Sequence, residues 1–148
     1  MDELDRIKSL IPHREPFLQV DRIIGFDRQE LCINTEKTFA ADLDIFKGHY
    51  PDNPIVPGVI LCEAIFQSGA LLMALLGQEK QGEQENAVPV LTRIGGARFK
   101  RFAGPGDTVQ IEVRVQETVG SATFFKGRLK VGGKTAVQIE FSCAMIDK

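Results

Sequence analysis

The chain has two histidines, and His49 stands in a segment suited to hold a side chain for chemistry. That segment, GHYPDNPIVPG at residues 48–58, has three prolines in eleven residues, too many for a regular helix or strand. A proline-rich loop fixes a side chain without committing it to a packing face, so His49 is a candidate general base. The alternative is a structural role, which we favour for His13 in its proline-flanked, charged turn.

Glu63 is the one charged residue in the apolar run of residues 59–76. An ionised, unpaired carboxylate is costly to bury, so something must solvate Glu63 or keep it protonated. Burial raises the pKa of a carboxyl group, and a glutamate that keeps its proton near neutral pH is a competent general acid. The alternative is a glutamate near a helix start that reaches solvent or interacts with the helix dipole.

Gly58 immediately precedes the same apolar run. At a helix start its N–H would have no intrahelical partner and no side chain to shield it, so it could donate to an oxygen that gathers negative charge. A base, an acid and such a donor therefore occur within fifteen residues. The sequence offers no serine or cysteine nucleophile with a plausible histidine partner, and no cluster with metal-ligand spacing.

Residues 59–76 must form the helix that positions these groups, because Pro57 lies near the first turn and Gly77 just past the end. Eighteen helical residues span roughly 27 Å. A helix that is apolar on every face is either a membrane span or the axis of a core. Glu63 and the polar Gln67 and Ser68 lie inside the run, which is also short for a membrane span, so we predict a core helix and no membrane insertion.

The remaining segments predict one short helix and an antiparallel sheet. Helical spacing marks residues 4–11, residues 78–86 form a polar loop, and the last three expected strands follow one another as hairpins. We expect strands at residues 17–26, 31–39, 88–102, 108–117, 122–131 and 135–145. The predicted fold is a single α+β domain over residues 1–148, a sheet wrapped around one central helix in the hotdog arrangement. Pairing of exposed strand edges predicts a homodimer.

Composition and charge bear on the partners of the protein and on its cellular compartment. The net charge of −2 gives no reason to bind nucleic acid, although residues 1–90 hold 8 Lys and Arg against 15 Asp and Glu, and residues 91–148 hold 10 against 5. Three widely spaced cysteines fit reduced thiols in a cytoplasmic protein better than a disulfide framework. The opening MDELDRIKSL carries charges throughout and has no apolar stretch of a signal peptide.

Three segments, at residues 11–22, 48–64 and 97–107, carry motifs that together resemble those of the FabZ-type (3R)-3-hydroxyacyl-[acyl-carrier-protein] dehydratases. The run IPHREPFLQVDR at residues 11–22 resembles that family's LPHRxPFLxVDR opening. Residues 48–64, GHYPDNPIVPGVILCEA, are similar to its active-site segment GHFPxxP[IV][MV]PGVxxxEA. Residues 97–101, ARFKR, followed by GPGD at 104–107, resemble its ARFKR and PGD strand and turn. The resemblance covers nearly the whole chain.

This resemblance implies a hydro-lyase of fatty acid biosynthesis. The implied reaction is dehydration of a 3-hydroxyacyl thioester on acyl carrier protein to the trans-2-enoyl thioester, with His49 as base, Glu63 as acid and the Gly58 amide as donor. The two groups of one site would come from opposite subunits of a dimer, and dimers of the family often associate into hexamers. No cofactor is implied. Glutamate at position 63, where related dehydratase/isomerases have aspartate, favours dehydration without isomerisation.

The resemblance also implies a binding surface and a tunnel. Phe66, Val90 and Leu91 are candidate lining residues of an apolar acyl tunnel beside the helix, with ordinary core packing as the alternative. The acidic carrier protein would dock on a basic surface at Arg93, Lys100 and Arg101. The chain departs from the family at RIGG, residues 93–96, where members typically have GIDK, and at Val90, where an aromatic residue often gates the tunnel. These departures bear on which acyl chain length the protein prefers and on which carrier protein it uses.

Three other functions fit the same features. The fold also hosts thioesterases, in which a helix carboxylate activates water to release a free thiol. A dehydratase of a specialised acyl or polyketide pathway would perform the same chemistry on another substrate. A catalytically silent acyl-binding subunit is the third alternative, and the presence of His49, Gly58 and Glu63 together argues against it.

Overall fold

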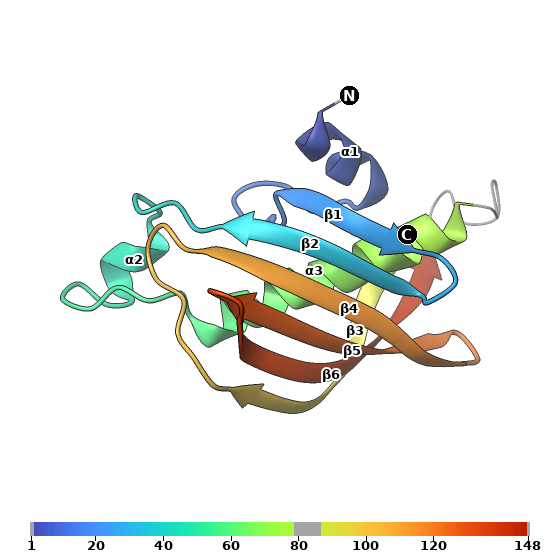
Figure 1. The fold of residues 1–148 in the computed structure, drawn as a ribbon. Helices are drawn as coiled ribbons and strands as arrows, with labels where there is room; N and C mark the ends of the chain where they lie inside the picture. Colours follow the sequence, from blue (N-terminus) through green and yellow to red (C-terminus); the bar gives the residue numbers. More distant parts are fainter. Residues whose placement is uncertain (1, 79–86, 148) are drawn as a thin grey trace.

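The computed structural model describes residues 2–78 and 87–147, which form three helices and six strands (Figure 1). In chain order the elements are α1 (Glu3–Leu10), β1 (Arg22–Asp27), β2 (Cys32–Thr38), α2 (Ile45–Gly48), α3 (Gly58–Gly77), β3 (Ala87–Phe99), β4 (Thr108–Val119), β5 (Ala122–Val131) and β6 (Lys134–Asp147). The side chain of Asp2 caps α1 by accepting from the N–H of Asp5. The single-turn helix α2 lies in the segment that leads to His49 and was not predicted.

The six strands form one antiparallel sheet in the order β1-β2-β4-β5-β6-β3. The sheet curves across α3, which lies behind its strands in Figure 1. Strands β1 and β2 pair antiparallel, and the consecutive hairpins predicted for the last three strands are confirmed. The hotdog arrangement predicted from one apolar helix among strands is therefore confirmed.

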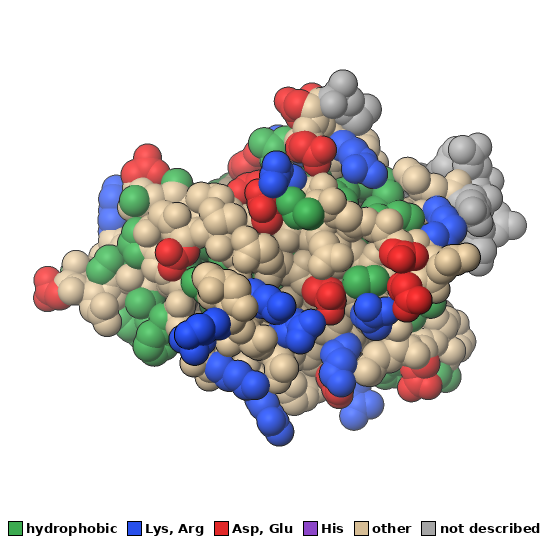
Figure 2. All heavy atoms as spheres, in the orientation of Figure 1, with side chains coloured by type: hydrophobic (Ala, Val, Ile, Leu, Met, Phe, Trp, Pro, Cys, Tyr) green, Lys and Arg blue, Asp and Glu red, His purple; other side chains and the backbone are tan. Residues whose placement is uncertain are grey.

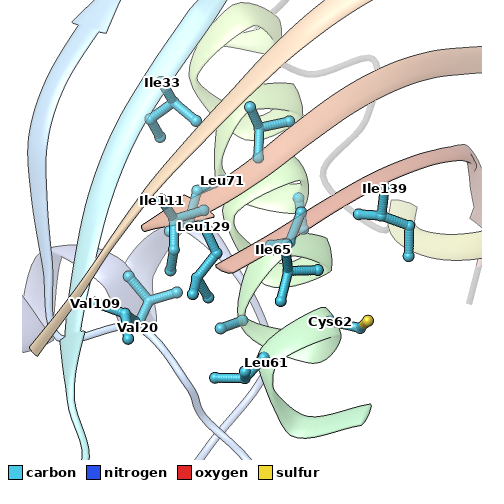
Figure 3. Packing of buried hydrophobic residues seen from close by; sticks show 14 of the residues in the cluster. Val20, Ile33, Leu61, Cys62, Ile65, Leu71, Val109, Ile111, Leu129 and Ile139 are labelled. Atoms are coloured by element: carbon cyan, nitrogen blue, oxygen red, sulfur yellow. The ribbon is translucent and has the colours of Figure 1, made fainter. Parts of the chain in front are cut away.

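Helix α3 is the axis of the core. It is long and apolar enough to cross a membrane by length and composition, but eleven of its residues are buried inside the fold. Ile65 and Leu71 are fully buried, and Figure 3 shows them among side chains of β2, β4, β5 and β6, such as Ile33, Ile111 and Leu129. The helix thus gains its stability from apolar burial by the sheet.

The predicted strand at residues 17–26 is wrong in its first half, because β1 begins only at Arg22. The N–H groups of Phe17 and Leu18 both donate to the carbonyl of Arg14, which makes a turn, and the N–H of Gln19 donates to the side chain of Gln67. Leu18 is nevertheless buried. Side-chain burial thus gave these residues the composition of a strand without strand pairing.

Smaller differences occur elsewhere. The predicted strand at residues 88–102 ends at Phe99, after which the N–H of Lys100 donates to the carbonyl of Ala136. The predicted helix at 4–11 ends at Leu10. Of the predicted polar loop at residues 78–86, Gln78 lies next to the end of α3, and residues 79–86 are outside the described part of the chain.

Among the described strands, β3 lies at an edge of the sheet and pairs with β6 alone. Its apolar side chains Leu91, Ile94 and Phe99 are 42%, 55% and 54% exposed. A long edge that exposes backbone N–H and C=O groups together with apolar side chains is a ready template for another strand. At the end of this edge the ring of Phe99 lies next to Gly58, the first residue of α3.

Candidate active site

His49 directly follows α2, and backbone hydrogen bonds hold it in place. Its N–H donates to the carbonyl of Ile45 at 3.1 Å, and its own carbonyl accepts from the N–H of Ile55 at 3.0 Å. Its ring nitrogen Nδ1 lies 3.1 Å from the carbonyl oxygen of Ile55. A carbonyl oxygen only accepts, so the neutral imidazole carries its proton on Nδ1 and presents the lone pair of Nε2. This tautomer is the one that a general base at Nε2 requires.

Gly58 is the first residue of α3, and Pro57 before it offers no side-chain cap. The first N–H groups of a helix therefore remain free of intrahelical partners at this point, together with the positive end of the helix dipole. The ring of Phe99, from the end of β3, lies so close that a Cβ atom at position 58 would stand 2.9 Å from its Cε1. Glycine thus allows close approach of another group to the start of the helix.

Glu63 is half-buried on α3, and its Oε2 accepts from Nε2 of Gln67 at 2.9 Å. Burial raises the pKa of the Glu63 carboxyl group above its ordinary value, and the hydrogen bond from Gln67 opposes that shift. The direction of the shift is the one that an acid needs in order to hold a proton near neutral pH. Glu63 also raises the pKa of the buried thiols of Cys62 and Cys143, although burial has the larger effect on both.

Gln67 is a functional candidate that sequence reasoning did not single out. It is fully buried, and in addition to Glu63 its side chain contacts two backbone groups of the segment before β1. The available signal was a polar amide four residues after Glu63 in an apolar helix, since residues at that spacing share a helix face. A buried amide in such a helix must have partners, and a polar neighbour one turn away is the first place to look.

The structure does not join His49 to Glu63 within one chain. The ring of His49 contacts the Ile55 carbonyl and stacks on Tyr50 at 4.1 Å, whereas Glu63 contacts Gln67. Among the described residues no hydrogen bond links the two predicted catalytic side chains. Tyr50 and Val59, which directly follow His49 and Gly58 in sequence, are 52% and 74% exposed, and Phe102, three residues after Phe99, is 78% exposed. Such apolar exposure beside an open strand edge marks a surface suited to a second chain.

The three predicted tunnel residues lie toward the β3 and β6 side of α3. Phe66 is half-buried and makes an edge contact with the ring of Phe141 on β6, with ring centroids 4.9 Å apart. Val90 and Leu91 on β3 pair with Ala144 and Cys143 of β6. Val90 is half-buried and Leu91 is exposed, so both remain open to a further group.

The predicted docking residues are exposed. Arg93 lies on β3 opposite Ser142 of β6, and Lys100 and Arg101 follow the end of that strand. Figure 2 shows further Lys and Arg side chains, mixed with Asp and Glu, over the outer face of the sheet. A hollow of about 620 Å³ lies on that outer face between β3, β4, β5 and β6, and its described lining includes none of the predicted site residues. We therefore do not place the active site there.

The described residues contain no group of three or more His, Cys, Asp or Glu side chains arranged to hold a metal ion. The groups that the structure places at this site are an imidazole, a carboxyl group held partly out of water and the amides of a helix start. This set can move a proton off carbon, return one to a leaving oxygen and stabilise the charge that develops between the two steps.

Comparison with known proteins places the chain in a family. A family model described as a FabA-like domain matches residues 11–140. The 3-hydroxyacyl-[acyl-carrier-protein] dehydratase FabZ of Cupriavidus metallidurans is 36% identical over 143 residues, which cover 97% of this chain and 93% of that protein. The protein of the same name from Caulobacter vibrioides is 34% identical over 145 residues, covering 98% and 89%.

Solved structures agree on the fold. The dehydratase heterocomplex ApeI:P from Xenorhabdus doucetiae superimposes with a TM-score of 0.78 at 16% identity, covering 100% of this chain and 93% of that chain. A mutant thioesterase from Pseudomonas aeruginosa gives 0.71 at 15% identity, covering 100% and 96%. Identities this low show shared architecture only, because one fold hosts many functions. The full-length sequence match is the more specific finding, and by it the chain belongs to the FabA-like family as a FabZ-type dehydratase.

Proposed function

We propose that this protein is a hydro-lyase that dehydrates (3R)-3-hydroxyacyl-[acyl-carrier-protein] thioesters to trans-2-enoyl thioesters in fatty acid biosynthesis. The observation that carries the proposal is the match to FabZ dehydratases over nearly the full length of both chains. The geometry supports it, because His49 presents a free Nε2 and Glu63 is held in an environment that favours its protonated form.

In the proposed reaction Nε2 of His49 removes a proton from the carbon beside the thioester carbonyl. The electron pair of that C–H bond forms the new double bond as the C–O bond to the 3-hydroxyl group breaks, and Glu63 gives its proton to the departing oxygen to make water. Negative charge on the thioester oxygen is stabilised by the Gly58 N–H and the N-terminal end of α3. Each proton-transfer group contributes about 10²–10⁴ in rate. No cofactor takes part in these steps.

We infer that the working unit is a homodimer formed along β3. Three observations support this: the unpaired edge, the exposed apolar side chains of β3, and the lack of a direct contact between His49 and Glu63 in one chain. In such a dimer His49 of one chain and Glu63 of the other complete each site. Light scattering at micromolar concentration tests this proposal and also separates dimers from trimers of dimers. A monomeric, active protein contradicts it.

The acyl chain is proposed to lie beside α3 against Phe66, Val90 and Leu91. Arg93, Lys100 and Arg101 form the proposed docking surface for acyl carrier protein, whose acidic surface complements their charge. A cytoplasmic location fits the three buried thiols, all of which are free. Nothing in the proposal involves nucleic acid or a membrane.

The deciding experiment incubates the purified protein with 3-hydroxyacyl carrier substrates of graded chain length and follows the products by mass spectrometry. Loss of one water with the acyl group still on its carrier supports dehydration. The acyl chain length that is turned over fastest indicates the length that the tunnel accommodates. Release of a free thiol assigns the protein to the thioesterases instead. If every substrate stays intact, the chain is a silent acyl-binding subunit or serves a specialised pathway.

A further inference from the structure

The side-chain amide of Gln67 has three hydrogen-bond partners, which together fix its orientation. Its Oε1 accepts from the N–H of Gln19 at 2.6 Å, and its Nε2 donates to the carbonyl of Phe17 at 2.8 Å and to Oε2 of Glu63 at 2.9 Å. The side chain has no exposed surface, so water does not compete for these groups. Both protons of the amide nitrogen are therefore committed, one to the backbone and one to the carboxyl group.

The two backbone partners prevent the amide from turning over. A backbone N–H only donates and a backbone carbonyl only accepts, so a flipped amide would set nitrogen against the Gln19 N–H and oxygen against the Phe17 carbonyl. Two unmade hydrogen bonds in a buried site are costly. The residues just before β1 therefore dictate that Gln67 meets Glu63 with an N–H and never with an oxygen.

A fixed N–H donor distinguishes the two oxygens of a protonated carboxyl group. The carbonyl oxygen of a carboxylic acid is a better acceptor than its hydroxyl oxygen, so the oxygen that faces the Gln67 N–H becomes the carbonyl oxygen. That oxygen is Oε2 of Glu63. The proton is consequently carried by Oε1, the oxygen that Gln67 does not contact.

We propose that Gln67 is a positioning residue that fixes the orientation of the Glu63 carboxyl group. It places the acidic proton on Oε1, from which the proton is delivered to the leaving hydroxyl group. The backbone groups of Phe17 and Gln19 in turn hold the Gln67 amide in place. This inference rests on the proposed dehydration. Gln67 does not touch the reacting atoms and acts through Glu63. The backbone of the turn before β1 thereby becomes part of the proposed catalytic arrangement.

The substitution Gln67→Glu separates the contact to Glu63 from the two backbone contacts. Buried beside the Phe17 carbonyl, the new carboxyl group keeps its proton, donates its one O–H to that carbonyl and accepts from the Gln19 N–H. It then has no second proton to offer Glu63. We expect kcat on a 3-hydroxyacyl carrier substrate to fall about 10- to 100-fold, since misplacement of a reacting group by about 1 Å has an effect of that order. KM should change less than twofold.

The control is Ser68→Ala on the same helix. Ser68 is also fully buried and polar, and bonds Thr35 and the carbonyl of Ala64 without contacting Glu63. This variant should unfold at a lower temperature but keep kcat within twofold. A Gln67→Glu protein that keeps wild-type kcat, or whose kcat falls only in proportion to its folded fraction by circular dichroism, overturns the proposal.

A double-mutant cycle tests whether Gln67 works through Glu63. In the Glu63→Gln background, Gln67→Glu should change the residual kcat less than twofold, because no acid remains to be positioned. A further loss of tenfold or more in that background contradicts the inference. If the wild-type protein itself releases no water, it is the proposed dehydration that fails. If the wild type is active but the variants behave otherwise than stated, it is the role of Gln67 that fails, so the two failures are distinguishable.

Discussion

The ring of Phe99 packs on Gly58, so the last residue of β3 touches the first residue of α3. A Cβ atom at position 58 would stand 2.9 Å from Cε1 and 3.2 Å from Cδ1 of that ring. The ring is 54% exposed and is the far end of a flexible side chain, so it can move aside. A methyl group at position 58 would therefore displace this ring and fill the space in front of the helix start.

Gly58→Ala should accordingly fold but lose activity. The added methyl group displaces the Phe99 ring and occupies the space through which a thioester oxygen reaches the helix N–H, so we expect kcat/KM to fall about 10²-fold, the order seen when an oxyanion donor is lost. Steady-state kinetics and thermal unfolding measure the two effects. Phe99→Ala combined with Gly58→Ala restores room for the methyl group. Recovery in the double variant assigns the loss to ring displacement, whereas full activity of Gly58→Ala alone contradicts the need for open space at the start of the helix.

Inactive variants should complement each other if each site combines two chains. Homodimers of His49→Ala and of Glu63→Ala should each lose about 10²–10⁴ in kcat while remaining folded. When both chains are coexpressed with different tags and the mixed dimer is purified, one of its two sites has both groups intact and the other has neither. The mixed dimer should then show about half the wild-type activity per dimer. A mixed dimer as inactive as its parents places His49 and Glu63 in the same chain.

The pH dependence of stability should report the burial of Glu63. Burial raises the pKa of this group in the folded state, so the folded protein holds the proton at pH values where the unfolded chain has released it. The contribution to stability is fully present below the unfolded pKa and is lost as pH rises through the folded pKa. The Glu63→Gln variant has no ionisable group at this position, so it does not lose this stability as the pH rises. Urea unfolding between pH 4.5 and 8 at constant protein concentration should show a stability gain of the variant that grows with pH. A gain that shrinks with rising pH contradicts this direction.

Carrier docking should depend on charge near the end of β3. Reversal of Lys100 and Arg101 to Glu should raise KM for a carrier-linked substrate at least tenfold. It should leave turnover of the coenzyme A thioester nearly unchanged, because in the proposed complex only the carrier contacts these exposed residues. The matched control reverses Lys126 and Lys130 to Glu on the outer face of the sheet. Equal losses on both substrates, or equal effects of both double variants, argue against docking at this surface.

The helix and strands follow from local patterns that the sequence displays directly. Residues 59–76 are apolar between Pro57 and Gly77, and α3 extends them by one residue at each end. The segment at residues 17–21 was mispredicted because its partners are distant in sequence. The Gln19 N–H is satisfied by a side chain 48 residues away, and no local pattern distinguishes such a partner from a neighbouring strand.

The site shows the same division between local and distant information. His49, Gly58 and Glu63 stand out by residue type and setting, because proline density and an isolated charge are visible in one sequence. The tautomer of His49 depends on the Ile55 carbonyl, and the role of Gln67 depends on backbone groups before β1. These contacts form only when the chain is folded, which is why the sequence indicated the candidate reacting groups but not the groups that orient them.

Close packing of β5 on α3 should make Gly127 intolerant of a side chain. A Cβ atom there would clash with Cγ2 of the fully buried Ile65. Overpacking of this kind destabilises by about 1–3 kcal/mol, so Gly127→Ala should unfold at lower urea concentration than wild type at equal protein concentration. Gly96→Ala is the matched control in β3, since a Cβ atom there meets nothing within 4 Å. Ile65→Ala vacates the space that the new methyl group needs, so the double variant should be less destabilised than the two single changes predict together. Additive losses in that double variant contradict a clash between these two residues.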